Sequence, residues 1–125
     1  MKHMRIGMVL LLFLLAGMAM VPMASAAIMT IYVPQPVWQS GNMYYEGTAT
    51  VSGSAASFIA ISCNLVDQDY NPLLPGVSNS AYNAKTVPVS GTHSCTPGIR
   101  YHTHCTAYST GPTTTADVDG LSSPC

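Results

Sequence analysis

The sequence predicts a small all-β domain, and three observations support that prediction. Ser and Thr supply 24 of the 99 residues after Ala26, a composition that favours extended chain and turns over long helices. Apolar and polar residues alternate in several short segments, and Gly, Pro, Asn and Ser separate these segments. Four cysteines in a short chain offer the cross-links that a domain with a modest core needs.

The first 26 residues have the features of a secretory signal peptide. A basic start is followed by an apolar stretch over residues 6–21, and Ala24, Ser25 and Ala26 form a small-residue cleavage site. The apolar stretch is shorter than the roughly 20 residues that a spanning helix needs. We therefore expect cleavage after Ala26 and a secreted product, extracellular or periplasmic, that no longer contacts the membrane.

The expected organisation is a signal peptide at 1–26, an N-terminal extended segment at 27–42 and a β-sandwich domain at 43–125. After Ala26 the chain carries five acidic side chains against Lys85 and Arg100, a net charge of −3. So few cations do not neutralise a run of phosphates, which excludes a nucleic-acid partner.

Two strands are predicted in the first half of the domain. The first covers Tyr44–Ser52 and the second, after the turn at Gly53, covers Ser57–Asp67. Side chains two apart share a face, so each strand has one apolar face that points inward. The inward residues are Tyr45, Gly47, Ala49 and Val51 in the first strand, and Ile59, Ile61, Cys63 and Leu65 in the second.

A long loop is expected over residues 68–80. Residues 67–72 have the composition of a turn, and the short apolar segment 73–77 that follows contains Pro75 and Gly76 and ends in another turn. Asp67-x-Asp69-x-Asn71 is interpreted as a simple Asx-rich turn, since Pro72 stands where a calcium loop needs Gly. A third strand is predicted at Ala81–Ser90. Pro88 cannot donate a ladder hydrogen bond, which places this strand at a sheet edge.

The last two strands form a predicted hairpin. Ile99–Ser109 carries an inward face that includes Tyr101 and Cys105, and Gly111-Pro112 reverses the chain into Thr114–Leu121. This hairpin returns the C-terminus to the end of the domain where Ile99 lies.

The four cysteines are expected to form two disulfides, as is typical of short exported chains. Spacing alone leaves three pairings open. Cys63 and Cys105 both lie mid-strand and face inward, so a bridge across the two layers of a sandwich suits them. Cys95 and Cys125 are brought to one end by the hairpin, which predicts a clasp there.

From Tyr44 to Leu121 the chain resembles the immunoglobulin-like sandwiches of exported proteins, with short strands, regular turns and a mid-strand cysteine pair. The resemblance implies a small two-layer sandwich. It leaves function open, because this architecture serves many functions.

No catalytic function is predicted, and no cofactor is expected. The sequence lacks the nucleophile-elbow pattern GxSxG, and every cysteine is assigned to a disulfide. Asp117 and Asp119 are interpreted as ordinary solvated residues beside a turn.

A metal site is the leading alternative. His102 and His104 alternate on one strand, so their imidazoles project from one face, a spacing compatible with Zn(II) or Cu(II), and His93 is a candidate third ligand. Two imidazoles on an exposed strand are more commonly ordinary surface residues.

Exposed aromatics provide the other surface signal. Five rings fall outside the inward registers, namely Trp38, Tyr44, Tyr70, Tyr82 and Tyr108, and we select Trp38, Tyr44 and Tyr108 as a candidate binding surface. The alternative is that some of these rings cover strand edges or pack beneath the 68–80 loop. The predicted function is a secreted, non-catalytic interaction or structural module that binds an extracellular protein or a cell-surface polymer such as a polysaccharide. A third possibility is a small secreted hydrolase or inhibitor whose working loop is 68–80.

Overall fold

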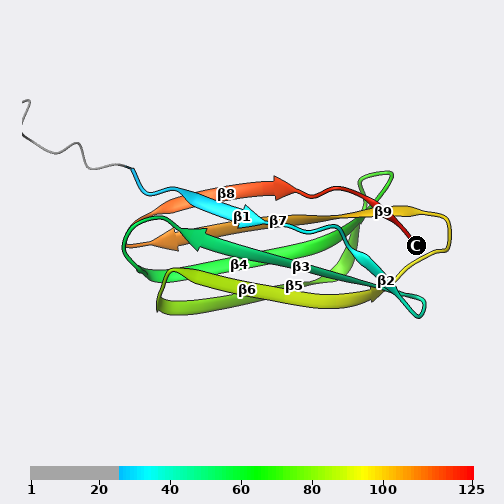
Figure 1. Cartoon of the computed structure of the whole chain (residues 1–125), viewed down its shortest axis with the longest axis horizontal. Coiled ribbons are helices and arrows are strands. Elements are labelled where there is room, and N and C mark those ends of the chain that lie inside the picture. Colours follow the sequence, from blue (N-terminus) through cyan, green and yellow to red (C-terminus); the bar gives the residue numbers. More distant parts are fainter. Residues whose placement is uncertain (1–25) are drawn as a thin grey trace, which may run out of the picture.

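The computed structural model describes residues 26–125, which form nine β-strands in two antiparallel sheets packed face to face. The strands run along the long axis of the molecule, with β5 and β6 at one side and β1 and β8 at the other (Figure 1). The predicted all-β fold with two layers is confirmed. The predicted signal peptide, apart from Ala26, lies outside the described residues.

The first sheet, sheet A, is organised around β3 (Asn42–Val51). Strand β6 (Thr86–Ser94) pairs with β3 along one side. On the other side, β1 (Met29–Tyr32) pairs with one end of β3 and β2 (Val37–Gln39) pairs with the opposite end.

The second sheet, sheet B, has the order β5-β4-β7-β8. Its central strands are β4 (Ala56–Asp67) and β7 (Arg100–Thr110), and its outer strands are β5 (Pro72–Ala84) and β8 (Thr114–Asp119). The short strand β9 (Ser123–Pro124) pairs with the start of β7.

The sandwich starts earlier in the chain than the sequence predicts. The segment 27–42, expected to precede the domain, contains β1 and β2, and both pair with β3. Met29 and Ile31 point into the core and are buried. A four-residue alternation is too short to be distinguished from ordinary extended chain in the sequence, which explains the difference.

The predicted loop at 68–80 and the predicted strand at Ala81–Ser90 are wrong. The chain forms one long strand, β5, to Ala84 and a second, β6, from Thr86. Near the end of β5, Asn83 adopts the left-handed backbone (φ 50°) that asparagine tolerates, and the chain then passes from sheet B to sheet A. Pro72 and Pro75 fit β5 because it is an edge strand, and Pro88 lies in an edge strand as predicted.

The core lies between the two sheets and follows the predicted alternation. Side chains at every second position of β3, β4 and β7 are almost fully buried, whereas their neighbours, apart from Val66 in β4, are partly or fully exposed. The buried side chains of these strands include Tyr45, Ala49, Val51, Ile59, Ile61, Leu65 and Tyr101. The inward faces predicted from period two are therefore confirmed.

Cys63 and Cys105 form a disulfide, as predicted, but it does not join the two layers. The residues face each other on neighbouring strands β4 and β7 of sheet B, with their Cα atoms 4.1 Å apart. Two inward residues of adjacent strands in one sheet are close enough to be bridged, and alternation alone does not distinguish this arrangement from a bridge between sheets. Both cysteines are fully buried.

Cys95 and Cys125 form the second disulfide, with their Cα atoms 6.0 Å apart. The chain around it is joined by backbone hydrogen bonds, from Gly98 N to Cys125 O (3.2 Å) and from Cys125 N to Ile99 O (2.9 Å). The predicted clasp at the end of the hairpin is confirmed.

Two disulfides in so small a domain are typical of proteins that function outside the reducing cytoplasm, in an extracellular or periplasmic environment. In residues 26–125 there is no helix of the length and apolarity that crossing a bilayer requires.

Candidate functional site

The outward side chains of sheet B form an open surface, which we call the outer face. In β4 these side chains alternate with buried isoleucines, and the strand register aligns them with outward residues of β7. Ala60 lies opposite Tyr108, and Asn64 lies opposite His104. Most of these side chains are half-buried or exposed, so the face is accessible to a ligand.

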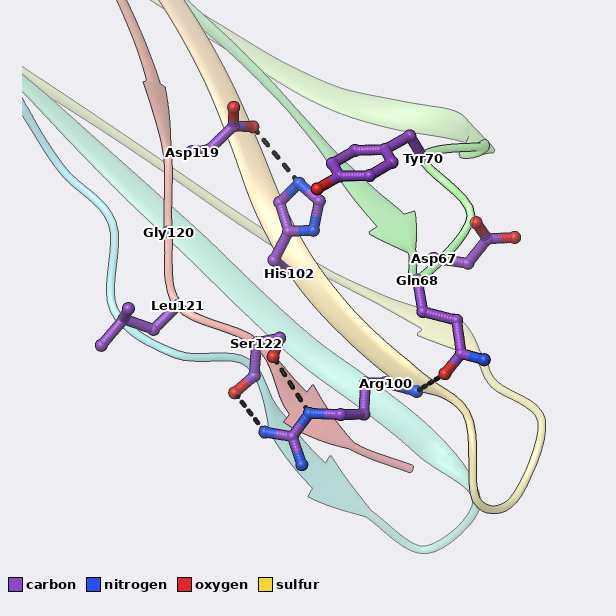
Figure 2. Close-up of a pocket in the computed structure, with 9 residues that line it drawn as sticks. All are labelled: Asp67, Gln68, Tyr70, Arg100, His102, Asp119, Gly120, Leu121 and Ser122. Atoms are coloured by element: carbon purple, nitrogen blue, oxygen red, sulfur yellow. Dashed lines mark hydrogen bonds and ion pairs between the residues drawn. The ribbon is translucent and has the colours of Figure 1, made fainter.

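At the end near the Cys95–Cys125 clasp, the outer face has a pocket of about 390 Å³ (Figure 2). Arg100 is fixed beside it, because its Nε donates to Ser122 Oγ and its Nη2 donates to Ser122 O, both at 3.0 Å. The backbone N of Arg100 donates to Gln68 Oε1 at 3.1 Å. Tyr70 and His102 also line this pocket.

Tyr70 is held at this pocket by a tight turn. Its backbone N donates to Asp67 O at 3.0 Å, and Asp67 Oδ1 accepts from the backbone N of Asp69 and of Asn71, both at 2.9 Å. The interpretation of this segment as an Asx-rich turn is confirmed. Tyr70 has a left-handed backbone (φ 62°), and its side chain is 80% exposed with its ring centroid 6.0 Å from that of His102.

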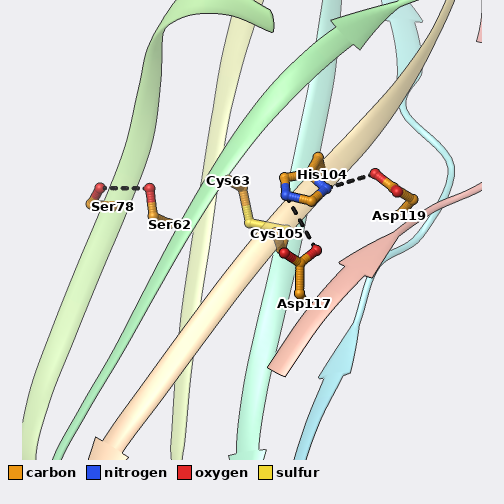
Figure 3. Close-up of a disulfide and its surroundings, with 7 residues drawn as sticks. All are labelled: Ser62, Cys63, Ser78, His104, Cys105, Asp117 and Asp119. Carbon is orange, nitrogen blue, oxygen red and sulfur yellow. Dashed lines mark hydrogen bonds and ion pairs between the residues drawn. A yellow bond between two sulfur atoms is a disulfide. The ribbon is translucent and has the colours of Figure 1, made fainter. Parts of the chain in front are cut away.

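Two histidines, His102 and His104, and two aspartates, Asp117 and Asp119, form a cluster in the middle of the outer face. Figure 3 shows His104 with both aspartates, and Figure 2 shows His102 with Asp119. His104 lies between the aspartates, with Nδ1 2.6 Å from Asp119 Oδ1 and Nε2 3.3 Å from Asp117 Oδ1. His102 Nε2 lies 3.3 Å from the same oxygen of Asp119. The hydrogen bond from His104 lowers the pKa of Asp119, partial burial opposes this, and the charges of both histidines lower it further.

The histidines share a face as predicted, but three of their four ring nitrogens lie close to carboxylate oxygens. Both nitrogens of His104 have an aspartate neighbour, and His93, the candidate third ligand, lies on β6 with its ring against the carbonyl oxygens of Ser94 and Leu74. Residues 26–125 bring together no group of three or more ligands able to hold a metal ion. The contacts of the cluster are a hydrogen bond between His104 and Asp119 and close His–Asp approaches, which are ion pairs where a histidine is protonated.

The opposite end of the outer face carries three aromatic rings, which we call the aromatic cluster. Phe58 lies between the other two, with its ring centroid 5.2 Å from that of Tyr82 and 5.7 Å from that of Tyr108. Tyr82 is 76% exposed and Tyr108 is 49% exposed. Phe58 therefore supports two rings that present their surfaces to solvent.

Next to the aromatic cluster lies a groove of about 510 Å³. Its floor and walls consist mainly of small side chains, including Ala60, Ser62, Ser80 and Thr106. The hydroxyls of Ser78 and Ser62 are 3.3 Å apart and hydrogen-bond across strands β5 and β4. Small residues with hydroxyls leave both space and hydrogen-bonding groups for a ligand.

The three aromatics selected from the sequence do not form one surface. Tyr108 lies on sheet B, whereas Trp38 and Tyr44 lie on sheet A, where Trp38 pairs with Met43. Trp38 is exposed, and the Tyr44 hydroxyl donates to Glu46 Oε2 at 2.9 Å. Alternation identifies an outward residue, but it does not reveal which sheet the strand joins.

Sequence reasoning missed Phe58, Asp117 and Asp119 as members of the face. Phe58 alternates with inward Ile59, so its outward position was readable from the pattern. The aspartates lie on β8 and not in a turn, and the hairpin register places Asp119 opposite His104. In the predicted hairpin Ser109 lies opposite Thr114. Counting five residues along each strand from that pair places His104 opposite Asp119, so the predicted hairpin already contained this contact.

Comparisons with known proteins do not assign a family. No protein-family model matches the sequence, and no curated protein matches it. One solved structure with similarity is the crystal structure of wild-type OgpA from Akkermansia muciniphila, at 9% identity and a TM-score of 0.35. The alignment covers 77% of this chain and 30% of that one, so the chain spans less than a third of that protein's length.

Substitution of His104 by alanine is expected to raise the pKa of Asp119 toward its usual value, because the hydrogen bond and the charge of His104 lower it. The pKa of Asp119 is lower in the folded than in the unfolded chain. Its ionised form therefore stabilises the fold above the unfolded pKa, and this contribution is lost as the pH falls through the lowered folded value.

Asp119 is mostly exposed, so the effect on stability is small, and an NMR titration of its carboxyl carbon is the suitable measurement. The control is Thr115→Ala on the same strand, which should leave the Asp119 titration unchanged. An Asp119 pKa that stays low in His104→Ala would contradict the assignment of His104 as the main cause.

Proposed function

We propose that this protein is a secreted, non-catalytic module that binds a cell-surface polysaccharide on the outer face of sheet B. The observation that carries the proposal is the aromatic cluster of Phe58, Tyr82 and Tyr108 beside a groove of small hydroxyl-bearing residues. The sandwich, which resembles immunoglobulin-like domains in its two antiparallel layers, acts as a rigid support for this face.

The chemistry of the face suits a sugar chain. Exposed aromatic rings stack on the apolar faces of sugar rings, and hydroxyl, imidazole and carboxylate groups hydrogen-bond to sugar hydroxyls. The groove volume of about 510 Å³ falls within the range of small-ligand sites. An extracellular protein partner is the competing occupant, because exposed tyrosines also anchor protein interfaces.

The absence of catalysis is part of the proposal. All four cysteines are in disulfides, which leaves no thiol nucleophile. In the part of the chain that the structure describes, both ring nitrogens of His104 face carboxylates and no serine hydroxyl is directed at them. Export is supported by the signal-peptide features of the sequence and by the two disulfides.

The test is retention of the purified protein on insoluble and immobilised polysaccharides, together with affinity measurements for any polymer that retains it. Tyr82→Ala and Tyr108→Ala are each expected to weaken binding by about tenfold or more, because each removes a stacking surface. Tyr32→Ala and Trp38→Ala are matched controls, since both residues are exposed aromatics on sheet A.

Binding that is equally weakened by Trp38→Ala, or that survives the loss of both Tyr82 and Tyr108, would reject the outer face as the binding site. Failure of every polysaccharide to retain the wild-type protein would reject the polysaccharide as the ligand.

A further inference from the structure

We infer that the ligand is a linear, neutral polysaccharide that lies extended along β7, from the aromatic cluster to Tyr70. This inference rests on the proposed function and specifies its ligand. It predicts that a chain of several sugar residues is required for full affinity, and that a single terminal sugar is not enough.

The hollows of the outer face follow one another along the central strands. The groove beside the aromatic cluster ends at Ser62 and Thr106, and the next outward residues, Asn64 and His104, line a second hollow of about 340 Å³. That hollow shares Tyr70, His102 and Asp119 with the pocket at the clasp. The three hollows therefore follow one another along the outward side chains of β4 and β7, and we call this series the path.

The path is long compared with one sugar ring. Tyr108 and His102 are six residues apart on β7, and a strand advances about 3.3 Å per residue, so their separation along the strand is roughly 20 Å. Tyr70 lies beside His102, with the two ring centroids 6.0 Å apart. A ligand that contacts both aromatic ends must be an extended chain.

Tyr70 has the features of a second stacking platform. Its side chain is the most exposed of the large apolar and aromatic side chains in residues 26–125, and the turn at Asp67 holds its backbone in a left-handed conformation that is costly for a residue with a Cβ. Tyr70 lines the pocket together with His102 (Figure 2), and His102 lies on the same face of β7 as Tyr108 of the aromatic cluster, six residues away. A ring held in this position is available to a sugar at the far end of the chain.

When His102 and His104 are uncharged, the charges along the path favour a neutral polymer. Asp117 and Asp119 lie beside its middle, and Asp67 lies at its end. The one guanidinium on the path, that of Arg100, already donates two hydrogen bonds to Ser122. The carboxylates accept hydrogen bonds from sugar hydroxyls, but they repel uronic acids and sulfate groups.

The experiment measures affinity for neutral oligosaccharides of increasing length, from disaccharides to hexasaccharides of the cello, xylo, manno and chito series, with alginate and heparin as anionic polymers. At least one neutral series should bind more tightly with each added sugar. Tyr70→Ala should weaken hexasaccharide binding by about tenfold and leave disaccharide binding unchanged, whereas Tyr108→Ala should weaken both.

Tyr70→Phe, which keeps the ring, should bind like the wild-type protein. Tyr70→Gly, which relieves the left-handed backbone, should behave like Tyr70→Ala and so separates loss of stacking from a folding defect.

If sugars bind and Tyr108→Ala abolishes binding, but affinity is independent of length and of Tyr70, the extended path is wrong and the proposed function stands. Tighter binding of alginate or heparin than of every neutral series would overturn the neutral ligand. No binding of any sugar by the wild-type protein would reject the proposed function itself.

Discussion

Replacing both Cys63 and Cys105 by alanine is expected to lower the free energy of unfolding by about 4 to 6 kcal/mol. The bridge closes a chain segment with a sequence separation of 42, for which the loss of unfolded-state entropy contributes about 4 kcal/mol. Both side chains are fully buried, so their truncation also leaves a small cavity at a cost of about 1 kcal/mol or more. Urea denaturation, followed by fluorescence and circular dichroism, measures the change.

The Cys95→Ala, Cys125→Ala variant is the matched control. Its sequence separation of 30 gives nearly the same entropic contribution, about 4 kcal/mol, but this clasp lies at the half-buried end of the sandwich. Its removal should therefore cost less than removal of the buried bridge. Equal losses in the two variants would show that burial of the Cys63–Cys105 bridge adds nothing to the entropy of loop closure. Small domains are stable by about 5 to 15 kcal/mol, so loss of the buried bridge removes a large share of the total stability.

The cysteine pairs illustrate what could be predicted from the sequence. Alternation along β4 and β7 placed Cys63 and Cys105 in the core, and the final hairpin placed Cys125 near Cys95. These predictions rely on period two and on chain reversal, which are local properties. The layer that each strand joins is not local, which is why the buried bridge was expected between sheets and is found within one.

The edge strand β5 is an element that the sequence did not predict. Pro72, Pro75 and Gly76 have the composition of a loop, and in the interior of a sheet they would interrupt the hydrogen-bond ladder. At an edge they are tolerated, because one side of the strand has no partner within its sheet. Whether a strand lies at a sheet edge depends on the whole topology, so the sequence alone favoured a loop. The hypothesis of a small hydrolase or inhibitor required that loop at 68–80, where the structure has strand β5 from Pro72 onward.

The candidate site could be predicted only in part, because its assembly also depends on the topology of the sheet. Tyr82 and Tyr108 were identified as outward-facing, but their contact through Phe58 depends on the pairing of β5, β4 and β7. These strands are distant in the sequence, and no local pattern specifies which of them are neighbours. A binding surface built from three strands therefore required the structure.

The second large effect concerns Gly47, because the buried disulfide of sheet B packs directly against it. A Cβ at this position of β3 would lie 2.6 Å from Cys105 Sγ and 2.8 Å from Cys63 Sγ, far closer than carbon and sulfur atoms approach without overlap. Gly47 does not have the left-handed backbone that favours glycine, so an alanine here is not strained by its own conformation. Its cost arises from the sulfurs.

Gly47→Ala should therefore lower the free energy of unfolding by about 1 to 3 kcal/mol in the wild-type chain, since the bridge holds both sulfurs in place. In the Cys63→Ala, Cys105→Ala background the sulfurs are gone, and the added methyl group fills part of the space they leave. The same substitution should there be neutral or stabilising, which gives a coupling free energy of about 1 to 3 kcal/mol. Thr48→Ala, an outward neighbour in β3, should show no such coupling. An equal loss for Gly47→Ala in both backgrounds would show that the cost arises in β3 itself and not from the contact with the two sulfurs.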